Sequence, residues 1–455
     1  MLLTAYTYLS DVSPMNFSGR LLGRTGSLRS LTRPVRKQAR HLVNFRLARM
    51  KRRRIAAKIV AITGSSGKST ATILASRFLE NGYTTRTQVF QNTISKCIET
   101  IRNTTPGDKF LVIETGASQT GSIVEMAGFL KPDIAVVTMV GVEHRSAFKT
   151  AENVAKEKGA LVEAVAEGGF AVLNADDENV MAMASRTKQR IVTFGRENEA
   201  DYRVVDLEQL PTGTMNLTIR SRHGKQRLAT KLLGTHFWPS VAAAYAVAME
   251  NGVSTEAIAK TIASVETGHN RCQPVPIENG PTFIIDTAKA PFSTLQAAFE
   301  VIRPLEAPRK RIVLGMIADH PGDSNTAYKR AYKMAAENAD QIIFVGEHAH
   351  RHKASAEDIA AGRIVEMPTL EKTCAYLRET AIPGEIILLK SSVAPHLERL
   401  ALAFQYDVKC WKDRCGLGIS CQRCGLYEYP YESHMQIGRQ KKKAERAGKK
   451  PDTVV

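Results

Sequence analysis

The chain has 455 residues, 43% of them hydrophobic, and a formal net charge of +18. This length exceeds what a single hydrophobic core supports, so we expect two or three domains in a protein of ordinary globular composition. No apolar run reaches the roughly 20 residues that span a bilayer, and residues 1–9 lack the basic leader and cleavage site of a signal peptide. We therefore expect a cytoplasmic protein, with peripheral contact to a membrane left open.

The positive charge is concentrated at the two ends. Residues 1–54 hold 13 Lys or Arg and one acid, and residues 436–455 hold seven Lys or Arg and two acids. Such ends fit anionic lipid, an acidic polymer or nucleic acid, and they also fit solvated tails. Residues 35–50 carry apolar side chains at helical spacing, which predicts a helix that lies on a membrane or, as we favour, docks on its own domain.

Strand-like and helix-like runs alternate through two further blocks, 55–268 and 269–407. Alternation of this kind predicts an α/β fold with mostly parallel sheets covered on both faces. We expect a central domain with a phosphate-binding loop, then a smaller Rossmann-like domain joined at a hinge near 267–271. Residues 1–54 form a basic, partly helical extension in this scheme, and residues 408–455 form a cysteine-rich tail. The predicted strands are 59–62, 110–114, 134–138, 171–174, 191–194, 282–286, 311–314, 341–345 and 385–389.

A glycine-rich loop follows the first predicted strand. It contains Gly-Ser-Ser-Gly-Lys-Ser, a shorter spacing than the common Gly-x-x-x-x-Gly-Lys-Ser. The glycines allow a tight turn whose N–H groups approach phosphate oxygens. Lys68 adds a positive charge, and the Ser69 hydroxyl can bind Mg²⁺. The nucleotide-binding candidates here are Gly64, Ser65, Ser66, Gly67, Lys68, Ser69 and Thr70.

Carboxylate and imidazole groups follow the next two buried strands. Glu114 ends one strand, and Glu143 and His144 follow another. The carboxyl ends of parallel strands line the ligand crevice of such sheets. Mg²⁺ prefers oxygen ligands, so Glu114 is a candidate ligand. His144 is a candidate contact to metal or phosphate, with a structural histidine as the alternative.

These motifs, with others in the same order, resemble the Mur ligase family, the ATP-dependent amide ligases of peptidoglycan assembly and their relatives. The resemblance covers about residues 55–405 and is greatest to the members that add D-alanyl-D-alanine to a muramoyl tripeptide. The matching segments are 62–69, 113–117, 131–135, 140–144, 155–159, 173–177, 234–236, 270–271, 284–286 and 388–390.

The resemblance implies a reaction in which a substrate carboxylate attacks the γ-phosphate of ATP and an amine then displaces phosphate from the acyl phosphate. Such phosphoryl transfer depends on positioning and charge neutralisation. Lys68 and the loop would hold the phosphates. Ser69 and Glu114 would hold Mg²⁺.

Further roles follow from the same resemblance. His144 would serve a second Mg²⁺, together with Lys158 as a carbamylated, carboxylate-like ligand. Lys156 is the nearby alternative to Lys158, and an ordinary surface lysine is the alternative for both. Arg271 would reach the γ-phosphate from the hinge. The remaining nucleotide-binding residues would be His236 and Asp286, at adenine and ribose, and Asn92.

The sequence departs from the family where the other substrates bind. Only 54 residues precede the loop, too few for the family's UDP-sugar-binding domain. The family's Asp-x-Tyr-Asn-x-Asn-Pro reads Asp-Thr-Ala-Lys-Ala-Pro at 286–291, its Lys-Gly-Ser-Arg reads Lys-Ser-Ser-Val at 390–393, and Ser240 replaces an Asn. We therefore expect the same reaction on a different acid and amine.

Four of the seven cysteines gather in the tail, with the spacing Cys-x₄-Cys-x₅-Cys-x₂-Cys. Four thiolates at such spacing suit a structural Zn²⁺, and an iron–sulfur cluster or redox pair is the alternative. The candidate ligands are Cys410, Cys415, Cys421 and Cys424, and His434 could replace one of them.

The sequence leaves two other functions open. One is elongation of a polyglutamate-like chain, and the other is a decayed ATP-binding scaffold whose basic, zinc-binding ends recruit nucleic acid or a partner. Retention of Lys68, Glu114, His144 and Lys158 favours the ligase. The expected partners are small-molecule or polymeric acids and amines, with membrane or acidic-polymer contact through the ends. We expect a monomer and no nucleic-acid binding.

Overall fold

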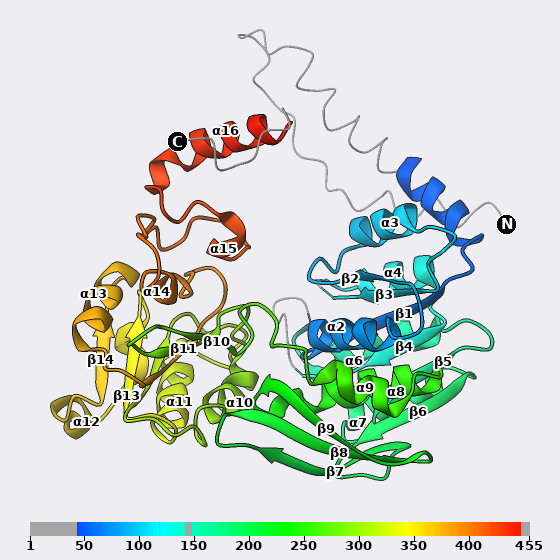
Figure 1. Ribbon diagram of the computed structural model, residues 1–455, viewed down its shortest axis with the longest axis horizontal. Coiled ribbons are helices and arrows are strands. Elements are labelled where there is room, and N and C mark those ends of the chain that lie inside the picture. The colour runs from blue at the N-terminus through cyan, green and yellow to red at the C-terminus, as the bar shows by residue number, and fades with distance from the viewer. Residues whose placement is uncertain (1–42, 118, 142–147, 447–455) are drawn as a thin grey trace, which may run out of the picture.

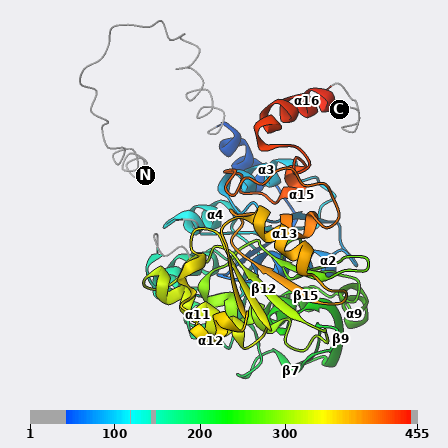
Figure 2. The same cartoon turned by 90° about the vertical axis from the view of Figure 1, so that its left-hand side faces the viewer.

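The computed structural model describes residues 43–117, 119–141 and 148–446. Two mainly parallel sheets lie side by side, each between layers of helices, and the cysteine-rich tail lies on the second (Figure 1). Figure 2 shows the second sheet in front, with the tail and α16 (His434–Arg446) above it. The predicted α/β fold, with a phosphate-loop body followed by a smaller Rossmann-like body, is confirmed.

The first sheet has nine strands in the order β2-β3-β1-β4-β5-β6-β7-β8-β9. Pairing is parallel from β2 to β7 and antiparallel from β7 to β9. The strands are β1 Lys58–Thr63, β2 Thr85–Gln88, β3 Phe110–Glu114, β4 Ile134–Val137, β5 Phe170–Asn174, β6 Arg190–Gly195, β7 Tyr202–Gln209, β8 Thr214–Ser221 and β9 Gly224–Leu233.

Both faces of the parallel strands are buried, as βαβ connections require. In β1, Val60 and Ile62 pack with α2 and α8, whereas Ile59 and Ala61 pack with α3, α4 and α6. The helices are α2 Lys68–Leu79, α3 Ile94–Asn103, α4 Ser122–Leu130, α6 Ala151–Glu163, α7 Glu178–Met181, α8 Trp238–Glu250 and α9 Thr255–Ile262, with short 3₁₀ turns at Ala182–Arg186 and Thr235–Phe237.

The antiparallel strands β7, β8 and β9 were missed by the sequence prediction. Side chains of β8 alternate between buried and partly exposed along its length. This pattern is typical of a strand with one face on the core and one face toward solvent. The segment lacks the continuous apolar run by which a buried parallel strand is predicted from sequence.

The second sheet has six strands in the order β10-β11-β15-β12-β13-β14, and only the β10–β11 pair is antiparallel. Its strands are β10 Gln273–Pro276, β11 Thr282–Asp286, β12 Lys310–Leu314, β13 Gln341–Val345, β14 Ile364–Met367 and β15 Ile386–Lys390. Its helices are α10 Leu295–Glu300, α11 Ser324–Ala336, α12 Ala356–Ala360, α13 Leu370–Thr380 and α14 Arg399–Leu402, with 3₁₀ turns at Phe292–Thr294 and Ala349–His352. The tail adds α15 Cys421–Cys424, a 3₁₀ turn at Tyr431–Ser433, and α16.

Residues 43–52 form a helix that docks on α3 and α4. Lys51 and Arg52 donate to backbone carbonyls near the ends of these helices at 2.6 Å, and the Phe45 ring lies 5.4 Å from that of Phe129. Docking is confirmed for these residues, but the predicted apolar face is not the docked one. Val43, Leu47 and Met50 lie on that face, and each is about half exposed. Residues 35–42 of the predicted helix lie outside the described part of the chain.

Candidate active site

The glycine-rich loop lies between β1 and the start of α2. Gly67 precedes α2 with a φ of 78°, and Gly64 has a φ of 150°. A Cβ on Gly64 would lie 1.9 Å from Thr138 Oγ1, and one on Gly67 would lie 2.6 Å from Ser240 Oγ. Both positions therefore require glycine, for backbone conformation and for space. The backbone N–H groups at the start of α2 form the anion-binding end of that helix.

Neighbouring elements hold the loop in this shape. At the end of β4, Thr138 Oγ1 donates to Ser66 O at 2.6 Å. The Ser65 hydroxyl accepts from Gly141 N and donates to its carbonyl, both at 2.9 Å. From α8, Ser240 Oγ donates to the loop at 3.1 Å. Sequence reasoning gave no role to Thr138, and it counted Ser240 only as a departure from the family.

Lys68 is the first residue of α2, and only 6% of its surface is exposed. Its ammonium donates to the carbonyl of Gly64 and, at 3.5 Å, to that of Ser65. The ammonium group therefore lies within the loop, where a phosphate would gain from its charge.

The segment joining the two sheets reaches the same loop. Arg271 Nη2 donates to Ser69 Oγ at 3.3 Å, and its guanidinium lies 6.0 Å from the centre of the Phe90 ring. Its Nε is buried and has no hydrogen-bond partner among the described residues. A buried donor of this kind needs an acceptor, and a phosphate oxygen is suitable.

Glu114 is buried at the end of β3 and is held by two donors. Phe90 N donates to one carboxylate oxygen at 2.9 Å, and Asn92 Nδ2 donates to the other at 3.1 Å. Each oxygen keeps a lone pair for another partner. Together with the Ser69 hydroxyl, this carboxylate is a hard oxygen donor set that fits Mg²⁺. Asn92, predicted to bind nucleotide, thus orients the predicted metal ligand.

On α6, the structure distinguishes the two candidate lysines. Lys158 is fully buried, whereas Lys156 is exposed. The adjacent Glu157 accepts from Gly121 N at 2.9 Å and Ile123 N at 2.7 Å, which fixes α6 against the start of α4. Burial selects Lys158 as the candidate. His144, the other predicted ligand of the second Mg²⁺, lies outside the described residues.

His236 and Asp286 lie near the connection between the sheets. Burial lowers the pKa of His236 to about 4, so its ring is neutral near pH 7. Its Nδ1 is buried without a partner among the described residues, and its Nε2 lies 3.9 Å from Cys272 Sγ. Asp286 instead forms an ion pair with Lys390, at 2.5 Å. Their proposed contacts to adenine and ribose stay predictions.

These contacts define a phosphate-loop protein in which the segment joining two α/β bodies brings an arginine to the loop. A sequence model of the Mur ligase middle domain matches residues 62–248, and one of the Mur ligase glutamate ligase domain matches residues 270–393. The chain belongs to the Mur ligase family.

Curated relatives agree with this assignment. The UDP-N-acetylmuramoyl-tripeptide--D-alanyl-D-alanine ligase of Mycobacterium tuberculosis is 29% identical over 77% of this chain and 74% of its own length. The enzyme of the same name from Escherichia coli is 27% identical over 80% of each chain.

Solved structures show the same fold. A crystal structure of MurF from Acinetobacter baumannii covers 80% of each chain with a TM-score of 0.72 and 22% identity. MurF ligase from Thermotoga maritima, solved in complex with ADP, covers 80% of this chain and 83% of its own, with a TM-score of 0.71 and 22% identity. The predicted family is thus confirmed, and the chain is an ATP-dependent ligase that forms amide bonds.

Proposed function

We propose that this ligase joins an acid and an amine other than the cell-wall precursor and dipeptide named for its relatives. The contact of Arg271 with Ser69, at 3.3 Å, carries the ligase part of the proposal, because it brings both bodies to one phosphate site. The substrate part rests on the edge of the second sheet.

The proposed reaction has two steps. A carboxylate oxygen of the acid bonds to the γ-phosphorus of ATP while the bond to the ADP oxygen breaks. The amine nitrogen then bonds to the acyl carbon, phosphate leaves with the bonding electrons, and the amine gives up a proton. Lys68 and Arg271 would balance the phosphoryl charge, and Ser69 and Glu114 would hold the Mg²⁺ that neutralises more of it.

The edge of the second sheet supports a changed substrate. Residues 287–291 follow β11 and lack the side-chain amides of the family motif. Here Lys390 Nζ pairs with Asp286 and also donates to Lys289 O at 3.0 Å. A charged cluster therefore occupies the carboxyl ends of β11 and β15, where α/β sheets bind ligands. Asp286 and Lys390 themselves match the family, so the change lies in residues 287–290, whose side chains replace the amides of the motif. A site without these amides selects a different ligand, so we infer a different acid or amine.

Substrate-dependent phosphate release tests the proposal. Purified full-length protein with Mg-ATP is given UDP-N-acetylmuramoyl-tripeptide with D-alanyl-D-alanine, or glutamate oligomers with glutamate, or a panel of other acids and amines. We expect release that needs both an acid and an amine, and none with the cell-wall pair. Full turnover with the cell-wall pair would refute the substrate proposal. A protein that does not bind Mg-ATP would refute the catalytic one.

Lys158 is proposed to carry a carbamate that binds a second Mg²⁺ with His144. Its full burial on α6 supports this, because it sets Lys158 apart from an ordinary surface lysine such as the exposed Lys156. Protein equilibrated with ¹³C-bicarbonate should show one carbamate carbonyl resonance by NMR. Lys158→Gln should abolish the resonance, and Lys156→Gln, on the exposed face of α6, should keep it. A resonance that persists in Lys158→Gln would contradict the assignment.

Three further features are proposals of the same kind: a zinc ion in the tail, a cytoplasmic monomer, and peripheral membrane contact through the basic ends. Among the described residues, no helix has the length and apolar character that a membrane span needs.

The exposed side chains of Val43, Leu47 and Met50 support surface contact with a membrane, since they lie on a helix rich in arginine. Wild-type protein should sediment with phosphatidylserine vesicles, and Leu47→Glu should not. The control Val205→Glu, at an exposed valine of β7, should still sediment. Equal sedimentation of both variants would exclude this helix as the membrane contact.

A further inference from the structure

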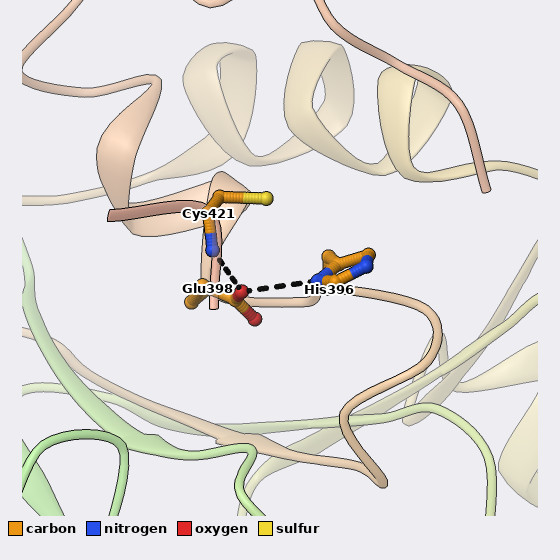
Figure 3. A group of neighbouring side chains, drawn as sticks. All are labelled: His396, Glu398 and Cys421. Atoms are coloured by element: carbon orange, nitrogen blue, oxygen red, sulfur yellow. Dashed lines mark hydrogen bonds and ion pairs between the residues drawn. The ribbon is translucent and has the colours of Figure 1, made fainter. Parts of the chain in front are cut away.

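The cysteine-rich tail meets two buried side chains of the second body. His396 and Glu398 precede α14, and Cys421 begins α15 in the tail. One potential ligand atom from each lies within 4.8 Å of the others, and all three residues are buried (Figure 3). Sequence reasoning assigned nothing to His396, because no motif links it to cysteines 14 to 28 residues further on.

His396 is held in the manner of a metal-binding histidine. Its Nδ1 lies 3.3 Å from Glu398 Oε1, a carboxylate that also accepts from Cys421 N at 2.9 Å. A carboxylate on one ring nitrogen leaves the other nitrogen to bind a metal, a recurrent arrangement in zinc sites. That other nitrogen, Nε2, lies 3.2 Å from Cys415 Sγ. A nitrogen and a sulfur bound to one tetrahedral Zn²⁺ lie about 3.6 Å apart.

The backbone of His396 supports this reading. Its φ is 58°, a left-handed conformation that costs energy in a residue other than glycine. Such conformations persist where the surroundings fix them, and they gather at functional sites. The ring contacts both Glu398 and Cys415, and 1% of the residue is exposed.

The other tail thiols lie around this pair. Cys421 and Cys424 are the first and last residues of α15, three residues apart on one helical turn, so their side chains lie on the same face of that turn. Arg399 is fully buried and donates to Cys410 O at 2.6 Å, with its Nη1 3.9 Å from Cys410 Sγ. A buried cation next to the tail compensates the negative charge that metal binding creates.

His434, which the sequence offered as a substitute ligand, is engaged elsewhere. Its Nε2 lies 2.9 Å from Tyr429 O. The Cys410 sulfur lies 3.9 Å from Arg399 Nη1, so this thiol has the buried guanidinium as its partner, and we assign it no ligand position. Three thiols and one imidazole then remain for the four ligand positions of a tetrahedral zinc ion.

We propose that His396, Cys415, Cys421 and Cys424 bind one zinc ion, which fastens the tail to the second body. The centre thus joins two segments of the fold and differs from a four-cysteine knuckle contained in the tail alone. The tail also contacts the connection between the sheets, where Ser420 Oγ lies 2.8 Å from His269 Nε2.

Metal content of the full-length protein tests the proposal independently of ligase activity. We expect about one zinc ion per chain by elemental analysis, and loss of at least tenfold in zinc affinity for His396→Ala under chelator competition. Cys421→Ser and Cys424→Ser should behave likewise. Matched controls that should keep zinc are His434→Ala, a tail histidine outside the cluster, and Cys374→Ser, a buried cysteine of α13.

Replacement of zinc by Co²⁺ separates a ligand from a merely structural residue. The wild-type visible spectrum should be that of a tetrahedral site with three thiolates, and folded Cys410→Ser should keep it. Unchanged zinc affinity in His396→Ala, or loss of zinc in Cys410→Ser, would overturn the ligand set in favour of four cysteines. A folded wild-type chain without zinc, or with iron in its place, would overturn the centre itself.

Discussion

Lys68→Ala is expected to lower kcat/KM for ATP-dependent ligation by at least ~10²–10³-fold, the cost of removing one charge that stabilises a transition state. The ammonium lies within the loop, against the carbonyls of Gly64 and Ser65, and only 6% of the residue is exposed. A charge placed this way before ATP binds needs no reorganisation during the reaction. Its loss should act on kcat as well as on ATP affinity, because negative charge on the transferred group shifts during transfer.

The matched control is Lys58→Ala, at the exposed start of β1, whose Nζ lies 3.3 Å from Asn251 Oδ1. This change should leave kcat/KM within about twofold, since an exposed contact contributes little. Phosphate release and circular dichroism on both variants separate lost chemistry from lost fold. A folded Lys68→Ala enzyme within tenfold of wild type would show that the loop does not hold the transferred phosphate.

The sequence predicted the positions of those site residues that lie in short local motifs. The loop from Gly64 to Thr70 lies between a strand and a helix, and Glu114 ends a strand, so local pattern places both at one sheet edge. The resemblance to the Mur ligases added Lys158 and Arg271. Lys158 is buried and Arg271 contacts Ser69 at the loop, and the roles of both stay predictions.

The parts that the sequence could not predict depend on strand order and on distant contacts. Asp286 and Lys390 are paired because β15 lies between β11 and β12, an order that local pattern does not encode. Asp286 therefore has an ionic partner that its motif did not suggest. His396 was missed for the same reason, since only the folded tail brings Cys415 to it.

The second large effect concerns stability. Arg311 in β12 and Glu385, just before β15, are both fully buried and form an ion pair. Arg309 also donates to this carboxylate, at 2.6 Å, and Arg311 Nη1 donates to Thr380 Oγ1 at 2.9 Å. Burial lowers the pKa of Arg311, and the carboxylate opposes that shift and keeps the guanidinium charged. The cluster lies at the amino ends of β12 and β15, away from the carboxyl end of β15, where Lys390 pairs with Asp286.

Glu385→Ala is expected to lower the free energy of unfolding of the second body by about 3–5 kcal/mol, because it leaves a buried guanidinium without its counter-charge. Glu300→Ala removes an exposed ion pair with Arg303, at 4.0 Å, and should cost less than about 1 kcal/mol. Replacement of both buried partners, Arg311→Met with Glu385→Leu, should restore much of the loss, since no fully buried charge is then left unpaired. Arg309 also loses its carboxylate, but 28% of its side chain is exposed and its guanidinium can turn to water.

Urea unfolding, with amide hydrogen exchange read in β12 and β15, assigns the loss to this body rather than to the first sheet. Equal effects of Glu385→Ala and Glu300→Ala would mean that water reaches the pair and screens it, contrary to its full burial. A double variant no more stable than Glu385→Ala would mean that the cost lies in packing volume rather than in charge. Since the cluster touches neither the loop nor Arg271, ATP affinity of the folded fraction should be unchanged in all three variants.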